Sequence, residues 1–247
     1  MNRKIIFAAV FLIIGFFVGF MANSRTTVIY EEIDSLGHIS FSYDKPVRTA
    51  SIMVPAVDEN KKGLTTILKV EIIPGKGRVL ANIGKMLYEP DSQNSVRIAH
   101  KVASEKTGTD LSNYDVIYTV ETDATAIEGP SAGAASAVAA IAALTGRKIK
   151  EGVLITGAIN HDGTIGPVSN VMEKAHAVSD MGINTLLVPL TQGSMDRFET
   201  RRCCEEIGTS SICMDEEIPQ KSSLSDLAGI EVIEVIDIDE ALGYLIE

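Results

Sequence analysis

The sequence predicts an α+β domain. Runs rich in β-branched residues indicate strands, and an alanine-rich segment in the middle of the chain indicates a buried helix. The strands come in groups and do not alternate strictly with helices, which favours α+β over a regular α/β arrangement. With 247 residues, of which 45% are apolar, the chain can form a packed core.

The first predicted element is a transmembrane helix over residues 1–23. Arg3 and Lys4 precede the uncharged run Ile5–Ala22, which spans roughly 27 Å as a helix and therefore matches the hydrocarbon core. A cleaved signal peptide is the alternative, although the run is long for one and lacks a small-x-small end. The positive N-terminal flank predicts a single-pass membrane protein whose remaining chain is extracytosolic.

Residues 24–50 are a predicted linker, and residues 51–247 are the predicted domain. Its strands are recognised by β-branched residues between turn formers; they are Ser51–Val57, Thr65–Ile73, Val116–Val120, Val153–Thr156, Thr185–Val188 and Glu231–Ile236. Its helices are recognised by apolar spacing and composition; they are Asp91–Thr107 (capped by Asp91 or Ser92), Ser131–Thr145 (ended by Gly146), Ser169–Met181 and Ile238–Leu245. The segment Asn160–Gly163 is predicted to form a hairpin-like turn.

A polar insertion is predicted at about residues 191–228, where no periodicity is evident. We expect a lid, a partner-binding loop or a disordered segment. It holds Cys203, Cys204 and Cys213, without the CxxC or His spacing of a zinc site. Outside the cytoplasm, Cys213 could form a disulfide with Cys203 or Cys204; three unpaired thiols are the alternative.

Charge excludes one class of function. The chain has 22 Lys and Arg against 33 Asp and Glu, a net charge of −11, which repels nucleic acid. The sequence contains no G-x-x-x-x-G-K-[ST] motif and therefore predicts no ATPase module. No cofactor and no metal are expected.

Ser131 is a candidate nucleophile because it follows a Gly-Pro turn at the predicted start of a helix. Backbone N–H groups and the partial positive charge there could stabilise an oxyanion; a plain N-cap serine is the alternative. None of the four histidines falls in a pattern pointing to Ser131. Lys174 lies in a mostly apolar helical setting, where burial would lower its pKa toward neutrality; an exposed helix lysine is the alternative.

A resemblance to a known family rests on the order of several motifs. The sequence EGPSAG is followed by TGAI, G-x-x-G-P-V, M-E-K-A and GIN-TLLVP. In this order they resemble the proteolytic domain of Lon proteases, from about residue 51 to 199, and the upstream Pro74–Gly77 looks like a family turn. The resemblance implies a Lon-type fold with Ser131 as nucleophile and Lys174 as general base. It also implies that Thr156 supports the lysine and that Glu128 has a modulating role.

The implied function is that of a serine endopeptidase with a Ser–Lys dyad. Without an ATPase module, it would cleave unfolded or flexible polypeptides independently of ATP, and the family implies a homo-oligomeric ring. Three alternatives remain: a catalytically silent Lon-like binding module tethered to the membrane, an amidase or esterase with the same dyad, and a nucleotide-binding domain with Gly157–Gly166 as phosphate loop. The last lacks the G-x-G-x-x-G pattern.

Overall fold

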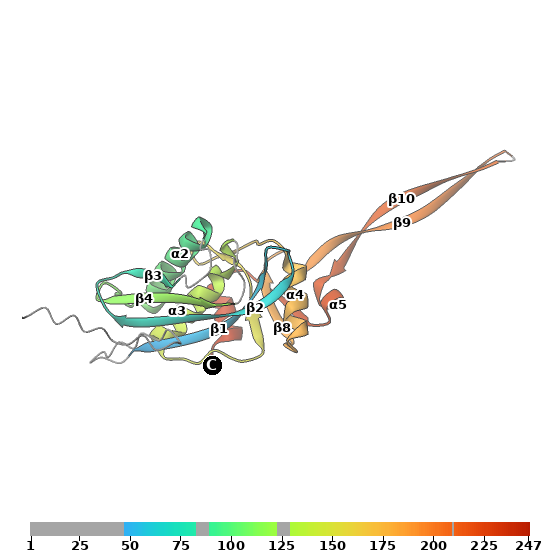
Figure 1. Ribbon diagram of the computed structural model, residues 1–247. Helices are drawn as coiled ribbons and strands as arrows, with labels where there is room; N and C mark the ends of the chain where they lie inside the picture. Colours follow the sequence, from blue (N-terminus) through green and yellow to red (C-terminus); the bar gives the residue numbers. More distant parts are fainter. Residues whose placement is uncertain (1–46, 83–88, 123–128, 209) are drawn as a thin grey trace, which may run out of the picture. The chain divides into compact units, whose positions relative to one another are not determined.

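The computed structural model describes residues 47–82, 89–122, 129–208 and 210–247 (Figure 1). The chain divides into two compact units, Met1–Ser42 and Tyr43–Glu247, and all described residues belong to the second. The predicted transmembrane helix and Glu128 lie outside the described residues. Within the described ranges, no helix is both long and apolar enough to cross a membrane.

The larger sheet has four strands in the order β1-β2-β4-β3. Their bounds are Arg48–Val57 (β1), Gly63–Pro74 (β2), Val79–Asn82 (β3) and Tyr114–Glu121 (β4). Strand β2 pairs antiparallel with β1 and β4, while β3 pairs parallel with β4. Alternate residues of β2 are buried, which fits a sheet with one face on the core. Three of these strands confirm the predicted runs; β3 was not predicted.

Two helices, α2 (Pro90–Thr107) and α3 (Gly133–Thr145), pack against each other, and α3 packs on β1 and β2 (Figure 1). All residues of α3 from Gly133 to Leu144 are buried, and its many alanines allow close approach to the sheet. The predicted caps of α2 were wrong. Its N-cap is Glu89, and Pro90 occupies the first turn, where a missing N–H costs no hydrogen bond. Gly146 ends α3 in a left-handed conformation, as predicted.

A second sheet is parallel and has the order β11-β8-β5. Its strands are Val153–Ile155 (β5), Thr185–Pro189 (β8) and Glu231–Val235 (β11). The helices of this half are α4 (Val171–Asp180), α5 (Leu224–Ala228) and α6 (Ile238–Leu245), and α4 also packs on β1 and β2. Two short strands, β6 (Ala158–Ile159) and β7 (Ile165–Gly166), form an antiparallel pair across the predicted turn. Residues 157–166 therefore form no strand–loop–helix of the kind that binds phosphate.

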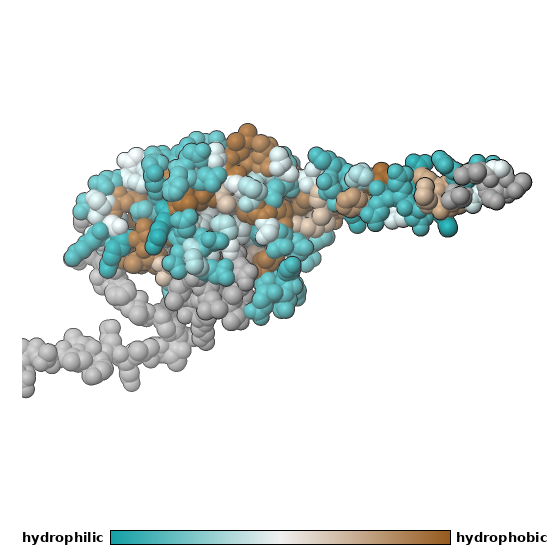
Figure 2. Space-filling model, turned by 90° about the horizontal axis from the view of Figure 1, so that it is seen from above, coloured by the Kyte–Doolittle hydropathy of each residue, from teal (hydrophilic) through white to brown (hydrophobic). Residues whose placement is uncertain are grey.

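The predicted insertion is a long β-hairpin, made of β9 (Ser194–Ile207) and β10 (Ser210–Ser223) (Figure 1). The expectation of a disordered segment was therefore wrong, whereas the expectations of a lid or a partner-binding segment stay predictions. Its described side chains are almost all exposed, and Figure 2 shows a mainly hydrophilic surface with isolated hydrophobic residues. Because neither face is buried, no alternation of apolar and polar residues marked these strands in the sequence.

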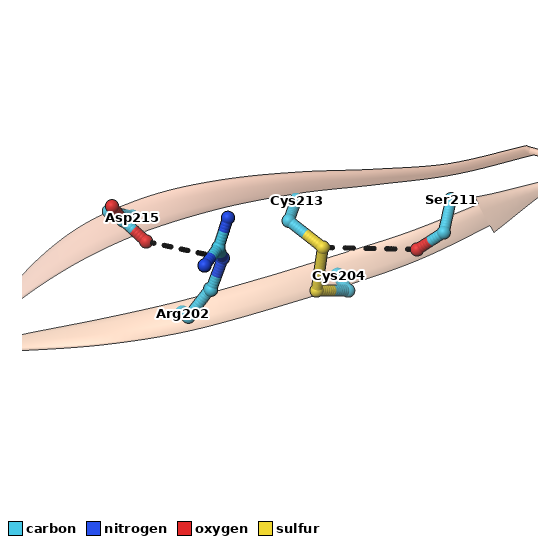
Figure 3. The surroundings of a disulfide bond; sticks show 5 residues. All are labelled: Arg202, Cys204, Ser211, Cys213 and Asp215. Carbon is cyan, nitrogen blue, oxygen red and sulfur yellow. Dashed lines mark hydrogen bonds and ion pairs between the residues drawn. A yellow bond between two sulfur atoms is a disulfide. The ribbon is translucent and has the colours of Figure 1, made fainter.

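A disulfide joins Cys204 to Cys213 across the hairpin, with their Cα atoms 4.0 Å apart (Figure 3). The two residues are direct partners in the register. Cys203 is a free, exposed thiol. Arg202 and Asp215 form an ion pair next to the disulfide, with 3.8 Å between Nε and Oδ1.

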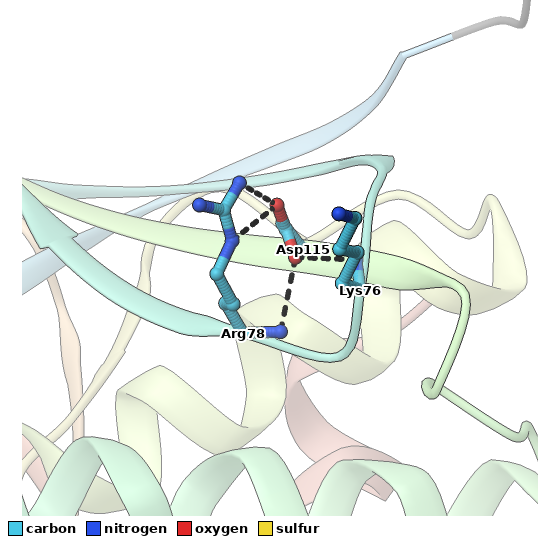
Figure 4. Close-up of polar contacts among 3 residues, drawn as sticks. All are labelled: Lys76, Arg78 and Asp115. Atoms are coloured by element: carbon cyan, nitrogen blue, oxygen red, sulfur yellow. Dashed lines mark hydrogen bonds and ion pairs between the residues drawn. The ribbon is translucent and has the colours of Figure 1, made fainter.

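Asp115, at the start of β4, is 1% exposed and holds the preceding Pro74–Gly77 turn in place (Figure 4). Its carboxylate accepts hydrogen bonds from the backbone N–H groups of Lys76 (2.8 Å) and Arg78 (3.0 Å) and from Arg78 Nε (2.9 Å). The Arg78 side chain is the main reason that the pKa of Asp115 lies well below its usual range. A Cβ atom at Gly75 would lie 2.1 Å from Asp115 Cγ, so this close approach requires glycine.

Candidate functional site

Ser131 lies in a short 3₁₀ turn, Pro130–Ala132, that precedes α3. The helix therefore begins at Gly133, two residues later than predicted, and its N-cap is Ala132. Gly129, with a φ of 85°, turns the chain into this segment. Ser131 makes no side-chain capping hydrogen bond, so the alternative of a plain N-cap serine is wrong. Among the described residues, none accepts a hydrogen bond from its hydroxyl.

Hydrogen bonds to the strand region after β5 fix the backbone around Ser131. Gly157 N–H donates to the carbonyl oxygen of Ser131 (2.9 Å), and Ala134 N–H donates to that of Gly157 (3.0 Å). A Cβ atom at Gly133 would lie 2.4 Å from Ser95 Oγ and 2.9 Å from the backbone N of Ile159. The small-residue motif thus allows the 3₁₀ turn to sit tightly between α2 and β6. Ser131 itself is 8% exposed.

Lys174 lies on α4 and is only 2% exposed, so the alternative of an exposed helix lysine is wrong. Burial lowers its pKa from 10.5 to about 8, while the adjacent Glu173 acts weakly in the opposite direction. Lys174 forms no ion pair with any described carboxylate. A buried lysine without an ionic partner can lose its proton near neutral pH, as a general base must.

Ser131 and Lys174 line the same open cleft, whose volume is about 610 Å³. One wall comes from the Gly-Pro turn before Ser131, and a second from the loop before α4. A third comes from the β1–β2 turn, and the last from the start of α2. The other lining residues are Val57, Asp58, Glu59, Lys61, Glu89, Asp91, Gly129, Pro130, Pro167, Val168, Ser169 and Asn170. The sequence motifs did not indicate Asp58 and Glu59. They form an ordinary polar turn, and only the tertiary fold brings them to this cleft.

A second, narrower pocket of about 40 Å³ also reaches Ser131. Its lining is largely apolar and comes from β1, β2, α2 and β4, including Val54, Leu68, Val96 and Val120. Ser131 therefore lies between an open cleft of mixed polarity and a small apolar pocket. Such a combination can hold an extended chain with one side chain inserted beside the serine.

Thr156 and Glu128 are the other two predicted site residues. Thr156 follows β5 and is fully buried, and its backbone N–H donates to Leu187 (3.0 Å). Its hydroxyl oxygen has no hydrogen-bond partner among the described residues. The expected support of Lys174 by Thr156 therefore stays a prediction, as does the role of Glu128, which lies outside the described residues. The described residues also hold no group of three or more potential metal ligands.

Comparison with known proteins identifies the family. The Lon protease (S16) C-terminal proteolytic domain matches residues 35–197, well over half of the chain. The chain belongs to the Lon protease family. It is 31% identical over 182 residues to Lon protease of Escherichia coli K12, covering 70% of this chain and 22% of that protein. It is 30% identical over 220 residues to Lon protease of Vibrio parahaemolyticus, covering 86% of this chain and 25% of that protein.

An archaeal Lon protease, from Methanothermobacter thermautotrophicus, is 29% identical over 140 residues, covering 54% of this chain and 21% of that protein. The chain thus spans about a quarter or less of the length of these curated Lon relatives. The family match ends at residue 197, close to the start of β9. Most of the β9–β10 hairpin therefore lies beyond the matched region.

Proposed function

We propose that this Lon family member is an ATP-independent serine endopeptidase in which Ser131 is the nucleophile and Lys174 the general base. One observation carries the proposal: Ser131, whose hydroxyl has no hydrogen-bond partner among the described residues, and a buried lysine with a lowered pKa line a single open cleft. Acyl transfer requires the base within hydrogen-bond reach of the nucleophile, and a shared cleft is compatible with this approach. A binding scaffold has no need of a buried lysine without an ionic partner among the described residues.

The reaction begins with neutral Lys174, which takes the proton from Ser131 Oγ as that oxygen attacks the peptide carbonyl carbon. The first N–H groups of the helical segment have no carbonyl one turn earlier, so they can donate to the developing oxyanion. The Lys174 ammonium then gives its proton to the leaving amine. An acyl-enzyme remains on Ser131, and water activated by Lys174 hydrolyses it.

Thr156 and Glu128 complete the proposed site. The buried Thr156 hydroxyl, which lacks a partner among the described residues, would accept a hydrogen bond from the Lys174 ammonium during the cycle. Glu128 would modulate the site from the segment just before the Gly-Pro turn. Both assignments are carried over from matching positions of the Lon motif.

The substrates we propose are unfolded or flexible polypeptides, because an open cleft beside Ser131 can hold an extended chain. The pocket of about 40 Å³ would favour a small apolar side chain next to the cleaved bond. We also propose that residues 1–23 anchor the chain in a membrane and that the protease domain is extracytosolic and assembles into a ring. The Cys204–Cys213 disulfide supports an oxidising compartment.

The first test uses the soluble part of the chain, from about Thr27 onward. Casein or unfolded-peptide cleavage is measured without ATP for the wild type, Ser131→Ala and Lys174→Ala. Lys148→Ala, which removes an exposed lysine, is the matched control. We expect cleavage by the wild type and the control only, with all variants folded by circular dichroism. An inactive but folded wild type would favour the catalytically silent binding module, and an active Lys174→Ala would remove lysine from the mechanism.

A further inference from the structure

The outer edge of β9 is not paired within the described chain. The hairpin is a two-stranded sheet of its own, so each strand has one partner and one open edge. Residues 201–206 in the middle of β9 are all exposed. An open edge of this length presents unpaired N–H and C=O groups, and proteins usually cover, interrupt or pair such edges.

The disulfide shows which backbone groups of β9 point outward. The Cα atoms of Cys204 and Cys213 are 4.0 Å apart, which is typical of a non-hydrogen-bonded antiparallel pair. The N–H and C=O of Cys204 therefore point away from β10, and by alternation so do those of Arg202 and Glu206. The backbone N–H and C=O of Cys203 point toward β10 and not toward the open edge.

The charges along the open edge of β9 complement those of the same edge in a second, antiparallel copy. The sequence from 201 to 206 reads Arg-Arg-Cys-Cys-Glu-Glu. An antiparallel second copy centred on Cys203 would place Arg201 opposite Glu205 of that copy, and Glu205 opposite its Arg201. Neither residue forms an ion pair with another described residue, so both are free for such a contact. Opposite charges directly across two strands stabilise their pairing.

The outer edge of β10 does not offer the same match. Residues 215–217 are all acidic, and antiparallel self-pairing there would set like charges against each other. Pro219 also interrupts this strand, and proline is a common device for blocking an edge. Of the two open edges, β9 is therefore the one suited to a second copy.

We propose that β9 pairs antiparallel with β9 of a second copy of this chain, about a two-fold axis through Cys203. The paired segment would run from Glu199 to Ile207 in both copies. Arg202 and Cys204 would exchange the backbone hydrogen bonds. The two Cys203 residues would form the central non-hydrogen-bonded pair, with Cα atoms about 4.5 Å apart, within the range for a disulfide.

A disulfide between the two Cys203 residues would therefore report the pairing of the two β9 strands. With oxidised glutathione as oxidant, one Cys203 thiolate attacks it, forms a mixed disulfide and releases one glutathione thiolate. The second Cys203 thiolate then attacks the protein sulfur and releases the other. The net reaction joins the two chains, and the two electrons lost by the protein thiols reduce oxidised glutathione to two thiols.

The experiment uses the full chain in detergent, and the covalent dimer is followed on non-reducing gels. Cys203→Ser should abolish it, whereas Cys204→Ser with Cys213→Ser should retain it, which excludes scrambling of the hairpin disulfide. Arg201→Glu should lower the rate of cross-linking on the order of tenfold, because it creates two repelling pairs. Arg197→Glu is the matched control; this residue is on the same strand and face but outside the paired segment, so the rate should not change.

The decisive variant is Arg201→Glu with Glu205→Arg, which exchanges the charges and should restore the rate. Restoration cannot come from pairing with β10, because position 201 still faces Glu216 and position 205 still faces Ile212. The rate at which Cys203 first reacts with oxidised glutathione is measured in the same variants, so that the changed charge beside the thiol is separated from pairing of the two chains. The proposal is overturned if the wild type forms no Cys203-linked dimer, if Arg201→Glu behaves like Arg197→Glu, or if the exchanged variant stays slow. None of these readouts requires protease activity.

Discussion

Replacing Lys174 by methionine should make the fold more stable while removing activity. Lys174 is 2% exposed, and burial lowers its pKa from 10.5 to about 8. A pKa change of one corresponds to about 1.4 kcal/mol, so keeping Lys174 charged in the folded state at pH 7 costs about 3 kcal/mol. Methionine has a similar length and no charge, and it would remove that cost.

The stability gain should depend on pH in a defined direction. Between pH 8 and 10.5 the unfolded chain binds the Lys174 proton and the folded chain does not, so wild-type stability rises with pH in this window. Urea unfolding should therefore show Lys174→Met more stable by about 3 kcal/mol at pH 7 but by less than about 1 kcal/mol at pH 10.

The exposed Lys148 provides the control. Lys148→Met should change the free energy of unfolding by no more than about 0.5 kcal/mol at either pH, as is usual for surface sites. A Lys174→Met variant with unchanged stability at pH 7, or with the same gain at both pH values, would contradict the buried, charge-destabilised lysine and with it the basis of the dyad.

Three further outcomes are expected. Peptidase activity should rise with pH and reach half its maximum near pH 8, where Lys174 loses its proton; a profile without this rise would exclude a lysine base. Gly63→Ala should reduce activity at least about tenfold, because its Cβ would lie 2.1 Å from the Glu173 carbonyl oxygen and displace α4. Gly243→Ala, in open space, should leave casein cleavage unchanged. Asp115→Asn should lower the free energy of unfolding by about 3 kcal/mol at pH 7, and this difference should shrink below pH 4, measured by urea unfolding.

Most core elements could be predicted because their residues carry the pattern of burial. The alternation in β2 and the alanine run of α3 reflect contacts with the core, so the sequence marked both. The four-residue strand β3 is too short to show such a pattern. The hairpin strands were not recognised because backbone pairing and a disulfide hold them together, and solvent faces both of their sides.

The residues of the candidate site likewise differ in whether a local sequence pattern marks them. Ser131 and Lys174 could be located because they lie in distinctive motifs, and the structure brings both to one cleft. The helix predicted from Ser131 begins two residues later, at Gly133, since the Gly-Pro sequence forms a 3₁₀ turn first. Asp58 and Glu59 could not be assigned, because they reach the cleft only through the packing of the β1–β2 turn against distant elements.

The two ends of the β9–β10 hairpin lie next to each other where it joins the domain. Leu224 N–H donates to the carbonyl oxygen of Gly193 at 2.9 Å, so the chain leaves and re-enters the domain at almost the same point. A short linker could bridge these two residues without moving β8 or α5. Evolution could therefore lengthen, shorten or exchange the segment between them while the cleft stayed intact, and a protein engineer could graft a binding peptide there in its place.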